Sequence, residues 1–288
     1  MDKLRILIAG CGDVGSALAH CLKDTHDIFA LRRSEQDYTN SIRPIKADLL
    51  NPNSLAVLPD VDIVVYCLAP SSQDKTKSVE QKYQETYIDG FKNLMSALPN
   101  TPKRVFFTSS TSVYGQNNHQ WVNEESVTEP ASIKGQLMLK AEQQVLNGDA
   151  PATVVRFSGI YAANRIHLLN QVKQGILHPA EPVSYSNRIH RDDCALVLAH
   201  LINLVHHNKP IDTLYLASDD LPIPIAQVCE FLAAQINSNA ANTAPTKPRA
   251  TASKRCDNSR LKASGFSFQY PDFRAGYTAI LQQLATNG

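Results

Sequence analysis

The feature that most constrains this chain is a glycine-rich turn near its N-terminus. The turn reads Gly10-Cys11-Gly12-Asp13-Val14-Gly15, between an apolar stretch at 4–9 and an amphipathic stretch at 16–22. A strand, this turn and a helix, in this order, direct a helix N-terminus at a pyrophosphate. Gly10 permits the tight turn, Gly12 lets the backbone approach the phosphates, and Gly15 lets helix and strand pack closely. The sequence therefore predicts a dinucleotide site whose contacts include Gly10, Gly12, Asp13, Val14 and Gly15.

Apolar strands alternate with helical segments along most of the chain. Predicted strands cover 27–32, 42–47, 61–67, 104–108, 153–157 and 213–217, and predicted helices cover 76–98 and 131–147. Repeated strand–helix alternation is typical of a parallel sheet covered by helices on both faces. The expected fold class is therefore α/β, with a doubly wound parallel sheet of the Rossmann type.

Composition and charge exclude several function classes. The 288 residues carry a net charge of +1, which gives no electrostatic footprint for nucleic acid. No apolar run approaches the roughly 20 residues of a membrane span, and the first strand begins too early for a signal peptide. The six cysteines are scattered without a C-x-x-C pair, which favours reduced core thiols over disulfides or a metal site. We expect a cytoplasmic protein that binds neither membrane nor nucleic acid.

The end of the second predicted strand bears on cofactor choice. An NAD-preferring site places an acidic residue there to accept hydrogen bonds from the ribose 2′-hydroxyl. This chain has Arg32 and Arg33 instead, and guanidinium groups suit a 2′-phosphate. The pattern predicts NADP(H). NAD(H) stays open because Glu35 lies close, and a solvated basic turn is the structural alternative.

Further motifs carry a family resemblance. They are Ala47-Asp48-Leu49, Cys67-Leu68-Ala69-Pro70, Thr108-Ser109-Ser110-Thr111-Ser112-Val113-Tyr114-Gly115, Arg156-Phe157-Ser158-Gly159-Ile160-Tyr161 and Ile189-His190-Arg191-Asp192-Asp193. Together with the N-terminal turn they resemble, nearly end to end, the extended short-chain dehydrogenase/reductase family, which includes nucleotide-sugar epimerases and dehydratases. The third motif is close to the family's specific Ser-Ser-x-x-Val-Tyr-Gly signature.

The resemblance implies further site residues and a domain division. It implies that Asp48 and Leu49 contact the adenine and that Cys67, Leu68 and Ala69 cover the cofactor. It also implies a Rossmann domain over 1–158 plus about 187–220, and a small C-terminal substrate lobe over about 159–186 plus 221–288. In the family the helices equivalent to 76–98 and 131–147 form a dimer interface, so the oligomeric state stays open with a homodimer as one alternative.

The chemistry departs from the family pattern. The family uses a Tyr-x-x-x-Lys pair, in which the lysine lowers the tyrosine's pKa for proton exchange. Matching the family's Gly and Glu without gaps places Lys134 on the tyrosine and Met138 on the lysine. Placing Lys140 on the lysine instead puts Gln136 on the tyrosine. No tyrosine occurs between Gly115 and Ala150, so the usual proton relay is missing.

Three explanations remain open for this departure. The protein is an oxidoreductase or epimerase with another acid or base, for which Lys134 and Tyr114 are candidates. Alternatively, it binds NADP(H) without turnover and acts as a sensor or regulatory protein. In the third explanation, substrate groups shuttle their own protons. Ser110 could polarise a carbonyl in each case, or simply cap its loop. The expected substrate is a small carbonyl or hydroxyl compound, and a nucleotide sugar is one alternative that the resemblance leaves open.

Two weaker patterns complete the survey. Tyr87 stands where the family often has an asparagine that faces the active site. Four basic residues near the C-terminus either hold an anionic substrate or form a solvated basic loop. They are Lys247, Arg249, Lys254 and Arg255.

Overall fold

The structure is a computed structural model that describes residues 2–35, 38, 41–71, 74–236 and 253–286. The chain forms two compact units. The first comprises Met1–Val113, Thr128–Arg156 and Ala195–Tyr215. The second comprises Tyr114–Val127, Phe157–Cys194 and Leu216–Gly288, so the stretch after the signature Val113 belongs with the C-terminal residues.

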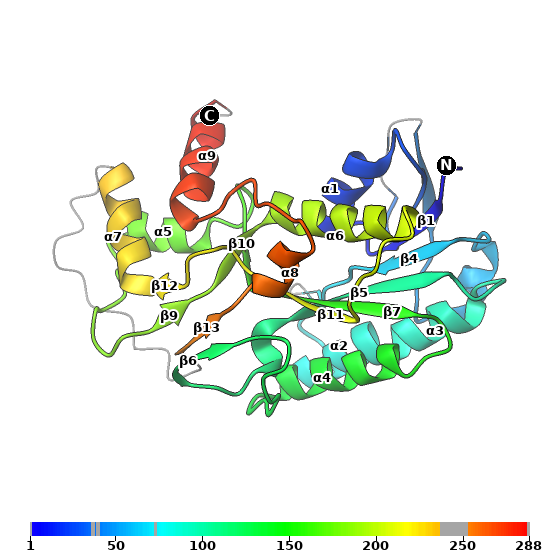
Figure 1. Cartoon of the computed structure of the whole chain (residues 1–288), viewed down its shortest axis with the longest axis horizontal. Helices are drawn as coiled ribbons and strands as arrows, with labels where there is room; N and C mark the ends of the chain where they lie inside the picture. The colour runs from blue at the N-terminus through cyan, green and yellow to red at the C-terminus, as the bar shows by residue number, and fades with distance from the viewer. Residues whose placement is uncertain (1, 36–37, 39–40, 72–73, 237–252, 287–288) are drawn as a thin grey trace. The chain divides into compact units, whose positions relative to one another are not determined.

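A seven-stranded parallel sheet forms the core of the first unit (Figure 1). Its order is β11-β7-β5-β4-β1-β2-β3. The strands are β1 (Arg5–Ala9), β2 (Asp27–Arg32), β3 (Ile42–Lys46), β4 (Ile63–Tyr66), β5 (Arg104–Ser110), β7 (Ala152–Phe157) and β11 (Leu214–Ala217). Strands β1, β4 and β7 are apolar and buried almost throughout, as strands covered on both faces must be. The predicted doubly wound sheet is confirmed.

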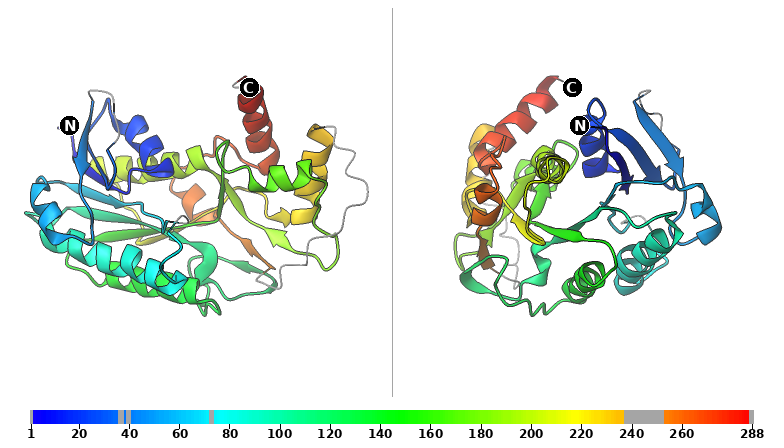
Figure 2. Two further views of the ribbon diagram at one scale, coloured as in Figure 1. Left: turned by 180° about the vertical axis from the view of Figure 1, so that it is seen from behind. Right: turned by 45° about the vertical axis from the view of Figure 1, so that its right-hand side comes forward.

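Helices cover both faces of this sheet. Figures 1 and 2 show α1 (Asp13–Leu22) and α6 (Arg191–His206) on one face and α2 (Val79–Tyr83), α3 (Gly90–Ala97) and α4 (Ile133–Leu146) on the other. The helix predicted at 76–98 is α2 and α3 joined by a π-helical turn, Gln84–Asp89, and Ser78 caps its start through a capping box with Gln81. Short 3₁₀ turns lie at Pro52–Val57 and Thr111–Val113.

The strand order indicates which edge of the sheet holds the candidate site. Chain order runs outward from β1 on one side through β2 and β3, and on the other side through β4 and β5. Because these pairs are parallel, their carboxyl ends share one edge of the sheet. Ligands of such sheets bind outside that edge, where the order reverses. Here the reversal lies between β1, which leads into the glycine turn, and β4, which leads into Cys67.

The described residues of the second unit form three two-stranded ladders and four helices that lie wholly within the unit. The ladders pair β8 (Gly159–Tyr161) with β10 (Arg188–His190), β9 (Tyr185–Ser186) with β12 (Ile223–Pro224), and β6 (Asn118–Val122) with β13 (Ser253–Cys256). The helices are α5 (His167–Lys173), α7 (Ile225–Gln235), α8 (Ser259–Ala263) and α9 (Phe273–Thr286). Leu169, Val228 and Phe273 belong to its apolar core.

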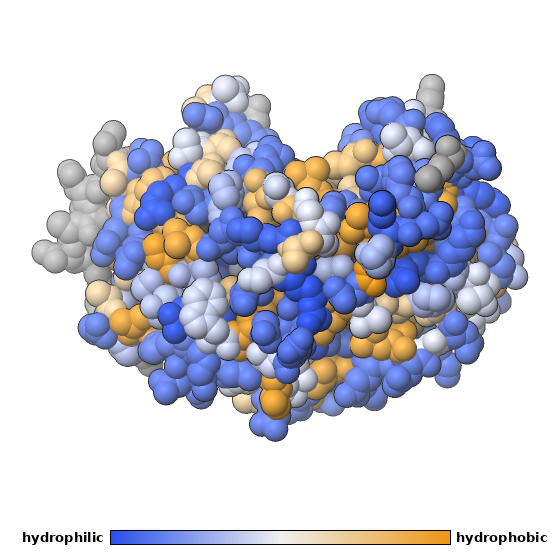
Figure 3. All heavy atoms as spheres, viewed as in Figure 1, coloured by the Kyte–Doolittle hydropathy of each residue, from blue (hydrophilic) through white to orange (hydrophobic). Residues whose placement is uncertain are grey.

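The surface is mostly polar on the face shown in Figure 3, where hydrophobic side chains lie in small scattered groups. Within the described ranges, no helix combines the length and apolar character that a bilayer crossing requires. The same ranges hold no group of three or more His, Cys, Asp or Glu side chains placed to bind a metal ion.

Candidate functional site

The glycine-rich turn is tied to both neighbouring strands. The Gly10 and Cys11 amides donate to the Leu31 carbonyl at 3.1 and 3.2 Å, and the Cys67 amide donates to Ala9 at 2.8 Å. Gly10 has a φ of +91°, and a Cβ there would lie 2.7 Å from Leu68 Cγ. A side chain is therefore excluded on two grounds. The turn after β1 and the loop after β4, which holds Cys67 and Leu68, are therefore in direct contact.

The other two glycines differ in what surrounds them. A Cβ on Gly15 would lie 2.5 Å from the Gly10 carbonyl oxygen, so Gly15 is needed for the turn itself to close. A Cβ on Gly12 would meet a single atom within 4 Å, the Gly10 oxygen at 4.0 Å. The space beside Gly12 is thus open, at the N-terminus of α1 where backbone N–H groups favour an anion. The backbone at Gly12, Asp13 and Val14 fits a pyrophosphate.

The arginines at the end of β2 are free of carboxylates. Within the described residues, neither Arg32 nor Arg33 makes an ion pair, and Arg32 is half-buried whereas Arg33 is exposed. Glu35 instead lies 2.6 Å from Lys46 Nζ, and this hydrogen bond lowers the pKa of Glu35. The one acidic residue that left NAD(H) open in the sequence is therefore paired with a lysine. The two guanidiniums keep their charge for a ligand.

The remaining cofactor candidates follow the carboxyl ends of β3 and β4. Asp48 is half-buried, and one of its carboxylate oxygens accepts from the Leu50 amide at 3.0 Å. Leu49 is buried, and its carbonyl accepts from the Asn93 side chain on α3. Ala69 is exposed in the loop after β4. The parallel sheet thus brings all twelve predicted cofactor residues to its carboxyl edge.

Sequence reasoning missed one residue at this edge. The Tyr38 hydroxyl donates to the Cys11 carbonyl in the glycine-rich turn at 3.2 Å. Burial raises the pKa of the Tyr38 phenol to about 12, so it stays a neutral donor. No periodicity or motif marks Tyr38, because its contact with the turn spans 27 positions of sequence.

Ser110 ends β5 beside the start of α4. Its Oγ accepts the Ser112 amide at 3.2 Å, so it does cap its own loop. A Cβ on Gly135 would collide with the Ser112 carbonyl oxygen and lie 2.5 Å from Pro130 Cβ. Gly135 therefore lets α4 approach this loop, which brings the neighbouring Lys134 to the same end of the helix. The close approach is between Gly135 and Ser112, two residues beyond Ser110, and the Lys134 side chain is exposed.

Two positions where the family has polar site residues, the relay lysine and an asparagine, hold an apolar and an aromatic side chain here. Met138, which aligns with the family's lysine, is buried. Tyr87 is buried too, with its ring 5.3 Å from that of Tyr83 and 6.1 Å from that of Phe107. Burial raises the pKa of the Tyr87 phenol above its usual range. In the second unit, the Tyr114 hydroxyl donates to the Asn123 carbonyl at 2.7 Å, a structural contact.

A buried ion pair locks the elements around Ser110. Glu142 on α4 accepts two hydrogen bonds from Arg156 on β7, at 2.9 and 2.6 Å, and a third from the Ser109 hydroxyl at 2.5 Å. The Glu142 and Arg156 side chains are 2% and 6% exposed. A bidentate pair of this kind fixes geometry as well as charge. It holds β5, β7 and α4 together next to Ser110.

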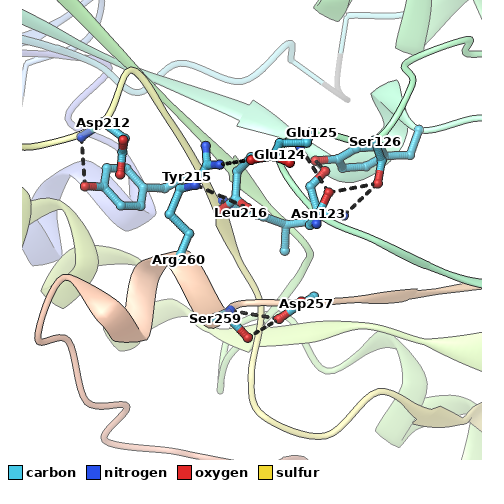
Figure 4. A network of polar contacts seen from close by, with 11 residues as sticks. Asn123, Glu124, Glu125, Ser126, Asp212, Tyr215, Leu216, Asp257, Ser259 and Arg260 are labelled. Atoms are coloured by element: carbon cyan, nitrogen blue, oxygen red, sulfur yellow. Dashed lines mark hydrogen bonds and ion pairs between the residues drawn. The ribbon is translucent and has the colours of Figure 1, made fainter.

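In the second unit, a polar network anchors the segment after β13 (Figure 4). Glu124 accepts from the Leu216 amide at 2.7 Å and lies 3.8 Å from Arg260 on α8. Arg260 also bonds Glu125 at 3.0 Å. The Asp257 amide donates to the Val122 carbonyl at the end of β6. These contacts fix β13 beside β6.

The four basic residues near the C-terminus differ in their surroundings. Lys247 and Arg249 lie outside the described residues. Lys254 is only 6% exposed, so the solvated-loop interpretation is wrong for it. Arg255 stacks on aromatic rings, with its guanidinium carbon 4.9 Å from the centre of the Trp121 ring and 5.2 Å from that of Tyr185.

Known proteins share this architecture. A solved structure from Methylobacillus flagellatus, assigned as an NAD-dependent epimerase/dehydratase, is 35% identical, with a TM-score of 0.83 and coverage of 99% of this chain and 100% of that one. The human epimerase family protein SDR39U1 (isoform 2), solved with NADPH, is 19% identical and shares the fold, with a TM-score of 0.78 and coverage of 97% and 99%.

A curated relative and a family model complete the comparison. The UDP-glucose 4-epimerase of Mycoplasma genitalium is 31% identical over 137 residues, which span 42% of this chain and 40% of that protein. The match therefore covers less than half of that relative's length. The family model described as the RmlD substrate binding domain matches residues 4–286. The chain therefore belongs to the RmlD substrate binding domain family and to the NAD-dependent epimerase/dehydratase group of extended short-chain dehydrogenases.

Proposed function

We propose that the protein binds NADP(H) in its first unit and uses it to oxidise, reduce or epimerise a nucleotide-linked sugar. The observation that carries the proposal is the pairing of an open backbone face at Gly12 with two carboxylate-free arginines after β2. The open face suits the pyrophosphate, and Arg32 and Arg33 suit a 2′-phosphate. Asp48, Leu49, Cys67, Leu68 and Ala69 are assigned to the adenine side and the cover of the same site.

Cofactor preference is tested by titrating NADPH and NADH against nicotinamide fluorescence. Arg32→Asp should lower the NADPH:NADH affinity ratio by at least about tenfold, because a charge-assisted contact is exchanged for repulsion. Arg43→Asp is the matched control, since Arg43 is an exposed arginine on β3 whose partner, Asp27, lies 3.9 Å away. An unchanged ratio in Arg32→Asp would show that the 2′-phosphate does not lie there.

The substrate class rests on the relatives' sugar-nucleotide chemistry, and the chain's own contribution starts at Ser110. Because Ser110 Oγ accepts the Ser112 amide, its hydroxyl proton can be donated to a substrate oxygen. The buried Glu142–Arg156 pair bonds the neighbouring Ser109 hydroxyl and so holds the end of β5. Lys134, at the family's tyrosine position, is the candidate proton carrier. When bound, the nicotinamide supplies or accepts the hydride.

Turnover is tested with UDP-glucose and NADP⁺, with the sugar nucleotides separated by chromatography and reduced nicotinamide followed by absorbance. We expect conversion that falls at least about tenfold in Ser110→Ala, within the range for one oxyanion donor or general acid. Lys134→Met should reduce conversion as well, whereas Lys140→Met, on the same helix, should not. Full activity in both Ser110→Ala and Lys134→Met would remove these roles.

A second function is favoured by one observation. Met138 is buried where the family has its lysine, and no described residue supplies a tyrosine on α4. A protein that holds NADP(H) without turnover, as a sensor or regulator, needs no relay. Tight NADPH binding with no conversion of any keto-sugar, aldehyde or sugar nucleotide would support this function, and sustained turnover would exclude it.

A further inference from the structure

A tyrosine reaches the glycine-rich turn from a position well separated from it in the chain. Tyr38 follows β2, and its hydroxyl donates to the Cys11 carbonyl at 3.2 Å across 27 positions of sequence. Both residues belong to the first unit, and Tyr38 is half-buried. The proposed cofactor site leaves this side chain without a role.

The Cys11 carbonyl is held by two hydroxyl groups. Ser16 on α1 donates to it at 3.0 Å, and Tyr38 is the second donor. A carbonyl oxygen has two lone pairs, so these two bonds fill its capacity. The Cys11 amide donates to the Leu31 carbonyl at 3.2 Å. Both backbone polar groups of Cys11 therefore have partners within the first unit.

These contacts fix the peptide that joins Cys11 to Gly12. At its other end the Gly12 amide donates to the Gly10 carbonyl at 2.7 Å. Rotating this peptide would break that bond and the two hydroxyl bonds together. A carbonyl oxygen carries a negative partial charge, so a carbonyl that turned toward the open face at Gly12 would oppose a pyrophosphate there. The hydroxyl bonds keep the Cys11 carbonyl from turning in this way.

The same contact lies near the basic end of β2. Strand β2 ends at Arg32, and Tyr38 follows before β3 begins at Ile42. Burial raises the pKa of the Tyr38 phenol and of the Cys11 thiol, and the positive charge of Arg32 opposes both shifts. Tyr38 therefore connects the part of the chain proposed to bind the 2′-phosphate with the turn proposed to bind the pyrophosphate. A tyrosine has only two side-chain torsion angles, so it holds such a contact at a small cost in entropy.

We propose that Tyr38 is a positioning residue of the cofactor site, where it holds the Cys11–Gly12 peptide in the orientation that receives the pyrophosphate. This inference rests on the proposed function and deepens it, because it concerns the same NADP(H) site. Tyr38 acts through the turn rather than on the cofactor itself. Without its hydroxyl the free protein adopts the competent orientation less often, which weakens every ligand that carries the pyrophosphate.

The test uses ligands that carry different parts of the cofactor. NADPH and NADH both carry the pyrophosphate, whereas 2′-AMP carries the 2′-phosphate without it. Tyr38→Phe keeps the ring and removes the hydroxyl. The affinities for NADPH and NADH, from nicotinamide fluorescence, should both fall about 3- to 10-fold, the range for one neutral hydrogen bond. The affinity for 2′-AMP, from displacement of NADPH, should stay within about twofold.

Two further variants complete the experiment. Ser16→Ala removes the other hydroxyl. The double variant should lose at least the product of the two single losses in NADPH affinity, because neither hydroxyl then holds the carbonyl. Tyr215→Phe is the matched control, since Tyr215 lies in the same unit and its hydroxyl accepts the Asp212 amide at 3.0 Å. This variant should bind NADPH as the wild type does.

The outcomes separate the two levels of the proposal. Unchanged NADPH affinity in both Tyr38→Phe and the double variant overturns the positioning role and leaves the cofactor site standing. A loss of 2′-AMP affinity equal to that of NADPH also overturns it, because Tyr38 would then act on the adenosine part of the ligand. A wild-type protein that binds neither NADPH nor NADH overturns the proposed function as well. Far-UV circular dichroism of each variant reports whether the fold is kept.

Discussion

Buried charges are treated in opposite ways in the two units. In the first, Glu142 and Arg156 form a bidentate pair that also takes up the Ser109 hydroxyl. In the second, Lys254 has one neutral acceptor, and among the described residues Arg188 Nη1 and Asp219 Oδ2 have no hydrogen-bond partner. Buried polar groups nearly always have a hydrogen-bond partner in native proteins, so the few that lack one require an explanation.

The comparison indicates that buried charges have different roles in the two units. In the first unit the proposed cofactor site is an open backbone face at Gly12, and the buried charges of Glu142 and Arg156 hold the scaffold. In the second unit the Arg188 and Asp219 charges attract one another, yet each side chain keeps one buried atom without a hydrogen bond, and Lys254 has no carboxylate partner among the described residues. The low dielectric of the interior raises the free-energy cost of a polar group without a hydrogen bond and strengthens the hydrogen bonds that do form. The following predictions are arranged to test this contrast.

The largest expected effect comes from breaking the satisfied pair. Glu142→Ala should lower the free energy of unfolding by about 3–5 kcal/mol, because Arg156 is left buried and unpaired. Urea unfolding followed by far-UV circular dichroism measures the loss. Glu35→Ala is the control, since its pair with Lys46 is exposed and screened by solvent, so little change in stability is expected. A loss below about 1 kcal/mol for Glu142→Ala would contradict the scaffold role.

The next effect is a pH dependence from Asp219. Burial raises the pKa of Asp219 to about 8, above its unfolded value of about 4. The folded state therefore holds the proton longer, and stability falls as pH rises from about 4 to about 8, by at most about 1.4 kcal/mol per pH unit. Asp219→Asn should flatten this slope in unfolding curves followed by Trp121 fluorescence. Asp193, whose pKa burial raises to about 6, should leave a residual slope confined to lower pH.

A third effect separates binding from folding in the first unit. Gly12→Ala should weaken NADPH binding by about 10- to 100-fold while stability changes by less than about 1 kcal/mol, because its methyl group meets the ligand rather than the protein. Gly15→Ala should reduce both, since its Cβ would lie 2.5 Å from the Gly10 oxygen. Equal behaviour of the two variants in NADPH titration and thermal unfolding would mean that the face at Gly12 is not the pyrophosphate site.

The smallest effect is the most direct test of the contrast. Lys254→Met removes a buried charge, as Glu142→Ala does, but it leaves no charged partner behind. The free energy of unfolding should therefore stay unchanged or rise by up to about 1 kcal/mol. Urea unfolding followed by Trp121 fluorescence measures the change. A loss above about 2 kcal/mol would indicate that the protein already balances this ammonium by itself.

The strands of the main sheet and the glycine turn could be predicted because their signals are local. Apolar runs such as 61–67 and 104–108 are long enough to stand out, and a turn motif is read within six residues. The ladders of the second unit could not be predicted. Strands β9 and β12 contain two residues each, and their pairing depends on segments far apart in the chain.

The candidate site likewise has features that the local sequence predicts and features that it does not. The sequence by itself predicted a dinucleotide site after the first strand and determined that α4 lacks a tyrosine, since both depend on residue identity over a few positions. Only the tertiary structure decided that Glu35 pairs with Lys46 and that Tyr38 donates a hydrogen bond to the turn. It also decided that Lys254 is buried without a counter-charge among the described residues. Burial and charge pairing depend on contacts between distant residues, which local patterns do not contain.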